Sequence, residues 1–381
     1  MLKRFVIFSA IFISVTVMAL QGQYKVLHVF NGTDGSYPIG SLIAKNHMLY
    51  GMTAIGGEFD EGAVFKIGLD GTGFALLHSF GGPSDGNSPN GSLIFYNGKL
   101  YGMTRRGGPV NMGVIFRINT DGTGFTILHT FTATTTDGGR PYGSLILYDG
   151  QFFGTTYVGG ASGRGTVFRF SPSGGGFKII HSFAGGAEGE GPTGTLTLVG
   201  TRLFGTTFLG GANGIGTIFR VLPGGEGFKV LHSFTGQPLD GSTPNCGALA
   251  AGGPWLFGAT EYGGANDLGA IFRIKTDGSE YALLHSLRSW DGFAPYSSVI
   301  SSGSKLYGMA SWGGAGGHGT IFVINADGTG IKVLHSFDYD AGGHPLGDLL
   351  RVVTNKSGTM LYGMTPVCTD GNGVIFSYKL R

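Results

Sequence analysis

The feature that most constrains this chain is an internal repeat, seen most clearly in residues 99–131. Three anchors occur seven times each: an aromatic residue followed by Gly, a Phe after a Gly-x-(Val/Ile) run, and a Leu/Ile-His pair. The aromatic-Gly anchor falls at Tyr50, Tyr101, Phe153, Phe204, Phe257, Tyr307 and Tyr362, and successive anchors are 50 to 55 residues apart. Seven copies at this spacing predict a propeller or a solenoid rather than several separate domains.

Each copy contains four short apolar runs and no run with a helical period. In the second copy the runs are residues 91–96, 99–104, 113–118 and 125–131, rich in β-branched and aromatic residues and separated by Gly, Pro, Asn and Asp. Such runs predict strands, and Asp121-Gly122 predicts a hairpin between the third and fourth. The chain is therefore expected to be all-β: a seven-bladed β-propeller with four antiparallel strands per blade.

The phase of the repeat predicts how the ring closes. Because the Asp-Gly hairpin joins the third and fourth strands, the chain begins with an isolated fourth strand, residues 24–30, and ends after a third strand, residues 374–380. We expect the N-terminal strand to complete the last blade and close the ring. One domain, residues 23–381 with a repeat of about 51 residues, then covers the chain after its leader.

Residues 1–22 have the layout of a secretory signal peptide. Lys3 and Arg4 precede an apolar stretch from Phe5 to Leu20, and small residues at Ala19 and Gly22 offer cleavage sites. We therefore expect a secreted or periplasmic protein with no membrane insertion after signal cleavage. An uncleaved anchor is the alternative, since the stretch is slightly shorter than the usual ~20-residue span.

Composition narrows the class of partner. Charged residues are 13% of the chain and the formal net charge is +2, which predicts a surface without the basic cluster that nucleic acid requires. The 75 glycines are interleaved with hydrophobic strands, so the composition indicates an ordered array rather than disorder. We expect a monomer that binds no nucleic acid and carries no cofactor.

Repeated polar residues have structural interpretations. The seven His residues, His28, His78, His129, His181, His232, His285 and His335, lie on outer strands too far apart to share a metal or substrate, so each should hydrogen-bond to a neighbouring loop or strand. The acidic position after each fourth strand, at Asp34, Asp85, Asp137, Glu188, Asp240, Asp291 and Asp340, should cap a turn by accepting from amides two residues on. Cys246 and Cys368 fall in different blades and should be separate thiols.

The Gly-Gly pairs, such as Gly107-Gly108, are predicted to be turns, because no helix follows them to make a phosphate site.

The run Leu203–Arg220, followed by the Phe- and His-containing segment 225–234, resembles the GloVer-type tandem repeat of exported bacterial proteins. The resemblance extends over the whole chain after the leader. It implies an extracytoplasmic repeat protein, often with a C-terminal surface anchor, and no established reaction. This chain ends at Arg381 directly after a strand, which favours free secretion or periplasmic residence. The repeat is also similar to kelch propellers, which supports the blade phase alone.

Residues that differ between copies are the candidates for a binding site. In an up-and-down blade, the linker into the first strand and the loop between the second and third strands lie on one face, here named the loop face. Its non-repeated aromatic, basic and imidazole side chains suit a sugar or another flat polar ligand. The predicted ligand-binding residues are Tyr37, Arg106, Arg140, Tyr142, Tyr262, Trp290, Tyr296, Trp312, His318 and His344. The alternative is that these side chains only cover the ends of the blades.

Three function classes follow from these residues. The favoured class is a non-catalytic exported propeller that binds a glycan, peptide or protein partner through the loop face. The second is a carbohydrate-active enzyme, a polysaccharide lyase or hydrolase, although no catalytic spacing is visible. The third is a structural or adhesion surface protein. His318, His344 and Cys368 are imidazole and thiol groups on adjacent blades, but their spacing matches no metal motif and we assign no metal.

Overall fold

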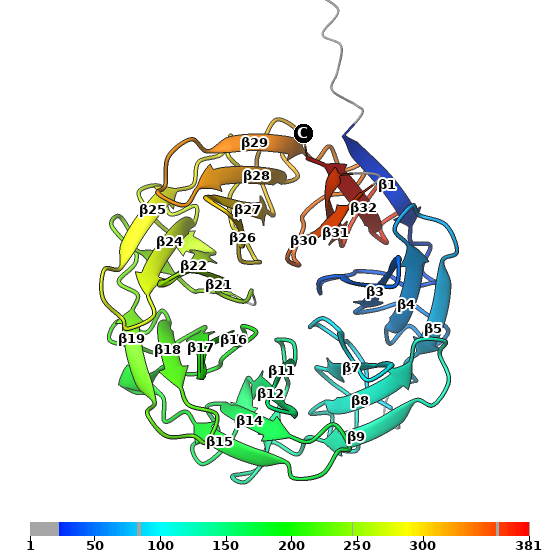
Figure 1. The fold of residues 1–381 in the computed structure, drawn as a ribbon, viewed down its shortest axis with the longest axis horizontal. Helices are drawn as coiled ribbons and strands as arrows, with labels where there is room; N and C mark the ends of the chain where they lie inside the picture. Colours follow the sequence, from blue (N-terminus) through cyan, green and yellow to red (C-terminus); the bar gives the residue numbers. More distant parts are fainter. Residues whose placement is uncertain (1–22, 82–84, 246, 356–357, 381) are drawn as a thin grey trace, which may run out of the picture.

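The protein is a ring of seven four-stranded antiparallel sheets around a central axis (Figure 1), where the entries to the first strands line a small cavity, here named the channel. The computed structural model describes residues 23–81, 85–245, 247–355 and 358–380. Residues 1–22, the predicted signal peptide, lie outside the described residues. In each sheet the first strand lies nearest the channel and the fourth forms the outer wall, so the predicted all-β seven-bladed propeller is confirmed.

The strands repeat from blade to blade with nearly constant length. Blades 1 and 2 contain β2 (Ile43–Lys45), β3 (Met48–Thr53), β4 (Ala63–Gly68) and β5 (Ala75–Ser79), then β6 (Ile94–Tyr96), β7 (Lys99–Thr104), β8 (Val114–Asn119) and β9 (Thr126–Thr130). Blades 3 and 4 contain β11 (Ile146–Tyr148), β12 (Gln151–Thr156), β14 (Thr166–Phe170) and β15 (Lys178–Ser182), then β16 (Thr197–Val199), β17 (Arg202–Thr207), β18 (Thr217–Val221) and β19 (Lys229–Ser233). Blades 5 and 6 contain β21 (Ala250–Gly252), β22 (Trp255–Thr260), β24 (Ala270–Lys275) and β25 (Ala282–Ser286), then β26 (Ile300–Ser302), β27 (Lys305–Ala310), β28 (Thr320–Asn325) and β29 (Lys332–Ser336).

Blade 7 is built from both ends of the chain. Its sheet has the order β1-β32-β31-β30, with β1 (Tyr24–Val29), β32 (Val374–Lys379), β31 (Gly358–Thr365) and β30 (Leu350–Thr354). The register pairs Tyr24 with Tyr378 and Val29 with Val374. The N-terminal strand therefore closes the ring, as the phase of the repeat predicts.

The remaining short elements lie in the linkers and in the loops between second and third strands. They are β10 (Gly138–Gly139) paired with β13 (Val158–Gly159), β20 (Gly241–Ser242) paired with β23 (Tyr262–Gly263), and the 3-10 turn η1 (Gly186–Glu188). No helix within the described residues has the length and apolar character needed to span a bilayer.

The aromatic-Gly anchor is explained by packing between the second and third strands. In blade 4, Gly205 of β17 lies opposite Phe219 of β18, whose ring is fully buried. A Cβ at Gly205 would lie 2.6 Å from the Phe219 Cζ atom, closer than carbon atoms can approach. The corresponding glycine of each blade faces its own Phe in the same way, at 2.4 to 2.6 Å. The glycine is therefore required so that the Phe ring can lie flat across the second strand.

Five of the seven repeated histidines make the expected hydrogen bond, whereas the buried His181 Nε2 has no hydrogen-bond partner among the described residues and lies 3.6 Å from Glu188 Oε2. His78 Nε2 lies 2.9 Å from Asp85 Oδ2, and its ring stacks on Phe125 of the next blade at a centroid distance of 3.9 Å. Similar imidazole–carboxylate hydrogen bonds of 2.8 to 3.0 Å occur at His28, His129, His232 and His285. Burial lowers the pKa of His78 although the Asp85 carboxylate opposes that shift, so this histidine is neutral near pH 7. Each such pair joins an outer strand to its linker and to the following blade.

The predicted role of the repeated acidic residues needs two corrections. Asp85 does cap a turn, but its Oδ1 accepts from the Gly81 amide, which precedes it, rather than from an amide two residues on. In the linker into blade 7, Asp338 rather than the predicted Asp340 caps the turn: Asp338 Oδ1 accepts from the Ala341 amide and its charge acts on His335, whereas the Asp340 carboxylate accepts from Thr369. The linker of blade 7 has a different turn from the others, which moves the acidic position. Cys368 is a buried free thiol, and Cys246 lies outside the described residues.

The two ends of the propeller differ strongly in charge. One end of the propeller is here named the hairpin face. It consists of the hairpins between third and fourth strands, the turns between first and second strands, and the adjoining halves of the strands. Among the described residues it carries sixteen basic side chains: Lys25, Lys45, Lys66, Lys99, Arg117, Arg169, Lys178, Arg202, Arg220, Lys229, Arg273, Lys275, Lys305, Lys332, Arg351 and Lys379. Its seven acidic residues are Asp70, Asp121, Asp149, Glu226, Asp277, Glu280 and Asp327.

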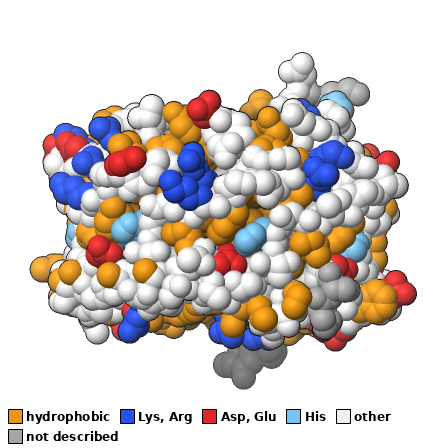
Figure 2. Space-filling view, turned by 90° about the horizontal axis from the view of Figure 1, so that it is seen from below, with side chains coloured by type: hydrophobic (Ala, Val, Ile, Leu, Met, Phe, Trp, Pro, Cys, Tyr) orange, Lys and Arg blue, Asp and Glu red, His pale blue; other side chains and the backbone are white. Residues whose placement is uncertain are grey.

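The loop face has the opposite balance. Its five basic residues are Arg105, Arg106, Arg140, Arg164 and Arg288, and the other sixteen acidic residues of the chain lie in its linkers, its loops and the approaches to the first strands. Figure 2 shows one side of this arrangement: most of the Lys and Arg lie above the band of His side chains, with some carboxylates among them, and further carboxylates lie directly below that band. The expectation of a surface without a basic cluster is therefore wrong, because the net charge of +2 averages two unlike faces.

Candidate functional site on the loop face

The loop face is held together by backbone pairing between each linker and the loop of its own blade. Phe293 and Trp312 exchange both backbone hydrogen bonds, at 2.8 and 3.1 Å, and Asn87 pairs with Arg106 in the same way. The short pairs β10–β13 and β20–β23 are the same contact in blades 3 and 5. The predicted placement of linkers and loops on one face is therefore confirmed.

The residue before each linker proline has a left-handed backbone. Six of these seven positions are not glycine, and their φ angles lie between 49° and 56°, at Tyr37, Ser88, Arg140, Thr243, Ala294 and His344. This conformation is unfavourable for such residues and doubly so before proline. It is maintained because each amide donates to a carbonyl of the preceding blade, for example His344 to His318 at 2.8 Å. The scaffold thus fixes the backbone while leaving the side chain free to vary.

Three of the predicted residues meet between blades 6 and 7. The His344 and Trp312 rings are 3.9 Å apart between centroids, and His318 Nδ1 lies 3.2 Å from His344 Nε2. His344 Nδ1 lies 2.9 Å from the Ser311 carbonyl oxygen, which can only accept, so Nδ1 carries a proton and donates it. Tyr339, which sequence reasoning missed, packs beside His318 at 4.9 Å. The group forms an aromatic and imidazole cluster on the surface.

The protonation states of this cluster follow from its contacts. Burial lowers the pKa of His344, and the nearby His318 lowers it further, against the opposing hydrogen bond to the Ser311 carbonyl. A neutral His344 with its proton on Nδ1 leaves Nε2 as an acceptor, so His318 Nδ1 donates to it. Trp312 remains 46% exposed beside this pair. Its indole face is therefore available to a ligand at a position fixed by the imidazoles.

A second pair of exposed groups adjoins the cluster. Trp290 is 66% exposed, and the Arg288 guanidinium lies 5.4 Å from its ring centroid. The Gly314 amide donates to the Ser289 carbonyl oxygen at 2.7 Å, which joins the Trp290 turn to the loop that follows Trp312. Both tryptophans therefore belong to one sector of the loop face.

Other predicted residues form a separate group on blades 2 and 3. Arg105 lies 4.6 Å over the Tyr142 ring, which meets Tyr157 edge-on at 5.4 Å. Arg140 is the pre-proline residue of the same linker, and Arg106 is exposed in the neighbouring loop. Among the described residues, the Lys and Arg ion pairs are Arg164–Glu190 and Lys275–Glu280, so these three arginines carry uncompensated charge. Arg164 and Glu190 line a nearby cavity of about 130 Å³ together with Tyr157.

The last three predicted residues stand apart from both groups. Tyr37 is 39% exposed in the linker into blade 1, and Tyr262 is 46% exposed on blade 5. A hydrogen bond to the Glu261 carboxylate raises the pKa of Tyr262. Tyr296 lines a small cavity between blades 5 and 6. The ten predicted residues therefore occupy one face but do not converge on one pocket.

The chain segments of different blades approach one another closely around the channel, where the linkers reach the first strands. Gly40, Gly91, Gly143, Gly194, Gly247 and Gly347 occupy equivalent positions there, and a Cβ at Gly40 would lie 2.3 Å from the Gly91 carbonyl oxygen. Blade 6 has Ser297 at this position. The Ser297 hydroxyl is buried and has no hydrogen-bond partner among the described residues.

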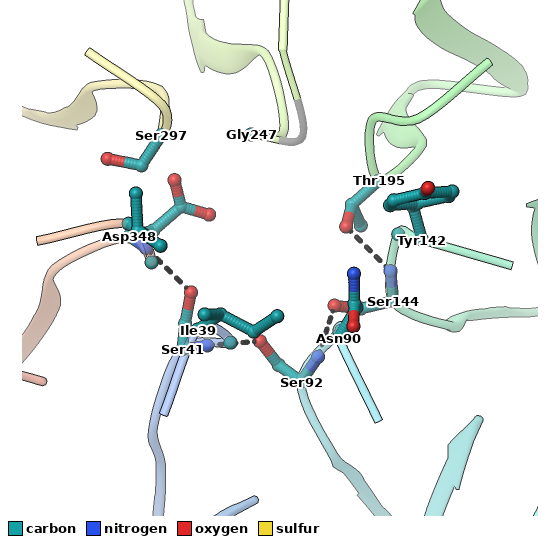
Figure 3. A pocket seen from close by; sticks show the side chains of 15 residues that line it. Ile39, Ser41, Asn90, Ser92, Tyr142, Ser144, Thr195, Gly247, Ser297 and Asp348 are labelled. Atoms are coloured by element: carbon teal, nitrogen blue, oxygen red, sulfur yellow. Dashed lines mark hydrogen bonds between the residues drawn. The ribbon is translucent and has the colours of Figure 1, made fainter. Parts of the chain in front are cut away.

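A ring of hydrogen bonds crosses the blades at the next residue. The amides of Ser41, Ser92 and Ser144 donate to the hydroxyl of the following blade at 2.7 to 2.8 Å, ending at Thr195. Ala248 in blade 5 offers no acceptor, and blade 7 has Asp348 instead of a hydroxyl. Figure 3 shows the Asp348 carboxylate directed into the cavity of about 30 Å³ at the channel. The symmetry of the ring is thus broken in blades 5 to 7.

The environment of Asp348 is unusual for a carboxylate. Burial raises its pKa to about 6, while hydrogen bonds from the Ser298 and Ala248 amides and from Ser41 lower it. The Ser298 amide lies 2.9 Å from Asp348 Oδ1. Sequence reasoning missed this residue because it compared loops rather than the repeated position itself. The residue after the repeated Gly position is Ser, Thr or Ala in the other six copies, so an alignment of the seven copies shows Asp348 as the only acidic residue at this position.

No group of three or more metal-ligating side chains occurs within the described part of the chain. Of the residues weighed as a metal cluster, His318 and His344 come together. Cys368 instead contacts the Gly373 carbonyl oxygen of its own loop at 3.9 Å. Two imidazoles without the thiol fall short of the donor set of a structural zinc site.

The sheets define a seven-bladed β-propeller, and its loop face carries the residues that differ between the repeats. The model of the Gloeobacter/Verrucomicrobia repeat matches residues 13–214 and 200–381, and the chain belongs to that family. A search of curated proteins finds no match.

Solved structures share the propeller fold. An oligogalacturonate lyase in complex with manganese is 11% identical, covers 88% of this chain and 86% of its own, and has a TM-score of 0.57. An oligogalacturonate lyase from Vibrio parahaemolyticus is 10% identical, with 96% and 95% covered and a TM-score of 0.55. A candidate 6-phosphogluconolactonase from Bacteroides uniformis is 17% identical, with 90% and 92% covered and a TM-score of 0.57. At these identities the likeness concerns the fold alone.

Proposed function

We propose that this propeller is a non-catalytic binding protein that holds a glycan on its loop face. The supporting observation is the distribution of exposed apolar side chains. Eight of the eleven large ones among the described residues belong to linkers and loops of this face: Tyr37, Ile55, Phe59, Val110, Leu239, Tyr262, Trp290 and Trp312. This distribution favours the loop face as the interaction surface, and the adjoining Trp290 and Trp312 form the sector where one ligand could contact two exposed rings.

The side chains near the two tryptophans favour a sugar over an apolar ligand. Trp312 and Trp290 offer flat rings, and His318, His344 and Arg288 lie within a few ångströms of them as hydrogen-bonding groups. A pyranose ring presents C–H groups to an aromatic face and hydroxyls at its edge, which this combination satisfies. Because the two exposed rings lie on different segments of the chain, an extended oligosaccharide would gain more contact than a monosaccharide.

One observation favours a carbohydrate-active enzyme as the second candidate. Asp348 has a pKa of about 6, so it could exchange a proton near neutral pH, and acids of this kind gather at catalytic sites. It lies in the channel rather than beside the tryptophans. An enzyme using Asp348 would therefore act on the end of a ligand that reaches the channel, and oligogalacturonate lyases have this propeller fold.

The test is a screen of immobilised oligosaccharides followed by calorimetric titration of the best ligand. Trp312→Ala should weaken binding by about tenfold or more, the usual loss of a stacking aromatic at a binding site. Trp255→Phe is the matched control, because Trp255 lies at the hairpin end against Arg273, with the ring 4.3 Å from the guanidinium. Equal affinity of Trp312→Ala and wild type would refute the site. Turnover of a bound oligosaccharide that is lost in Asp348→Asn would favour the enzyme.

A further inference from the structure

The charge on the hairpin face forms a ring. Basic residues recur at one position of the third strand, as in Arg169 and Arg220, and at the first residue of the fourth strand, as in Lys178, Lys229 and Lys332. The three lysines are exposed. Because the positions repeat from blade to blade, they lie at one height around the molecule. The hairpin face is therefore positive over its whole width.

Most of this charge is not neutralised within the protein. Lys275–Glu280 is the Lys or Arg ion pair of this face among the described residues. Lys25 and Lys66 donate to the carbonyl oxygens of Asp70 and Thr120 in neighbouring hairpins, at 2.9 and 3.4 Å, and so keep their charge. Sixteen basic residues against seven acidic ones leave a strong positive field over this end of the molecule.

Both ends of the described chain leave the propeller on this face. The fourth strand of every blade runs from the hairpin face to the loop face, so β1 begins at Tyr24 on the hairpin face. The 22 residues before Gln23 are joined to the protein there. Leu380 follows β32 at the same end, where its amide donates to the Thr359 carbonyl oxygen at 2.9 Å.

We propose that the hairpin face docks on the surface of a bilayer that contains anionic phospholipids. A ring of basic residues contributed by every blade presents a positive field to a flat anionic surface from all sides, whereas a linear polyanion would follow one groove or stripe. β1 begins on this face, so the predicted leader would hold this end toward a membrane for as long as it remained uncleaved. Docking in this way involves no insertion and leaves the loop face directed outward, open to ligand.

The test uses the chain from Gln23 onward, which contains every strand of the closed ring. Co-sedimentation is measured with phosphatidylcholine vesicles and with vesicles containing about one third phosphatidylglycerol, in low salt and at about 0.3 M salt. We expect binding only to the anionic vesicles and a large loss of binding in high salt. Equal binding to neutral vesicles would overturn the proposal.

Matched triple variants test the face. Lys178→Glu, Lys229→Glu and Lys332→Glu together should lower the vesicle affinity at least about tenfold. The control triple Arg106→Glu, Arg164→Glu and Arg288→Glu makes the same change of net charge on the loop face and should retain the wild-type affinity. Equal losses in both triples would show that net charge alone matters, which overturns the proposal.

Two further measurements distinguish lipid binding from misfolding and from self-association. If the lysine triple fails to fold, by its circular dichroism and melting profile, the Lys→Gln triple at the same positions replaces it, and wild-type binding of that triple would overturn the proposal. Light scattering without vesicles tests a second copy as the partner. The alternative outcome is self-association of the protein that is salt-sensitive and that the lysine triple abolishes. That result would show that the hairpin face binds the acidic loop face of another copy, and it would also overturn the proposal.

Discussion

Replacement of Asp348 by Asn should change how stability depends on pH. In the folded protein the pKa of Asp348 is raised from 3.8 to about 6 by burial at the channel. A folded-state pKa above the unfolded value means that the folded protein binds more protons between these two values. Stability from this residue is thus fully present below about pH 4 and is lost as the pH rises through about 6.

The size of the effect follows from the shift. About two pKa units correspond to ~3 kcal/mol of unfolding free energy. The Asp348→Asn variant keeps an acceptor for the Ser298 amide but cannot titrate. The difference in unfolding free energy between wild type and variant should therefore fall by most of that amount between about pH 4 and pH 7. Any constant cost of the altered hydrogen bonds cancels in this comparison.

Urea denaturation followed by tryptophan fluorescence measures the difference at closely spaced pH values. The carbon resonance of the Asp348 carboxyl group, recorded during a pH titration of the folded protein, gives the pKa directly. A difference that stays flat across this range, or one that rises with pH, would refute the account of the buried carboxylate.

Two further predictions concern the scaffold. Gly205→Ala places a methyl group 2.6 Å from the Phe219 ring and should destabilise the protein by about 1–3 kcal/mol, while Gly175→Ala, 3.8 Å from its nearest neighbour, should cost far less; equal denaturation midpoints would contradict the packing argument. Burial alone would raise the pKa of Asp240, but hydrogen bonds from His232, Tyr281 and the Thr235 amide reverse the shift and lower it. Asp240→Asn should therefore cost stability near neutral pH and progressively less below about pH 4, and a cost independent of pH in melting experiments would count against it.

The fold was predictable because its determinants are repeated. The seven aromatic-Gly and His anchors each report one contact that every blade must make, such as Gly205 against Phe219 or His78 on Phe125. Repetition reveals such contacts in a single sequence. The blade phase, and with it the closure of the ring by β1, followed from the position of one Asp-Gly hairpin.

The site was less predictable because it depends on the exceptions. The sequence identified the loop face and its variable residues, but distances across the ring depend on turn conformations that the repeat does not specify. The contact of His318 with His344 depends on the left-handed backbone at His344. Asp348 was overlooked although its carboxylate replaces a hydroxyl of the repeat. The charge of the two faces could have been read from the sequence once the blade phase was known.

The positions of the three tryptophans allow a direct test of the central claim, that ligand binds on the loop face. Trp290 and Trp312 lie on that face, and Trp255 lies at the opposite end. Fluorescence titration with the bound oligosaccharide should change the emission of the Trp255→Phe variant as strongly as that of wild type. The Trp290→Phe, Trp312→Phe double variant, which retains Trp255, should show no change. An emission change that persists in the double variant and is lost in Trp255→Phe would place the ligand at the hairpin end and contradict the account.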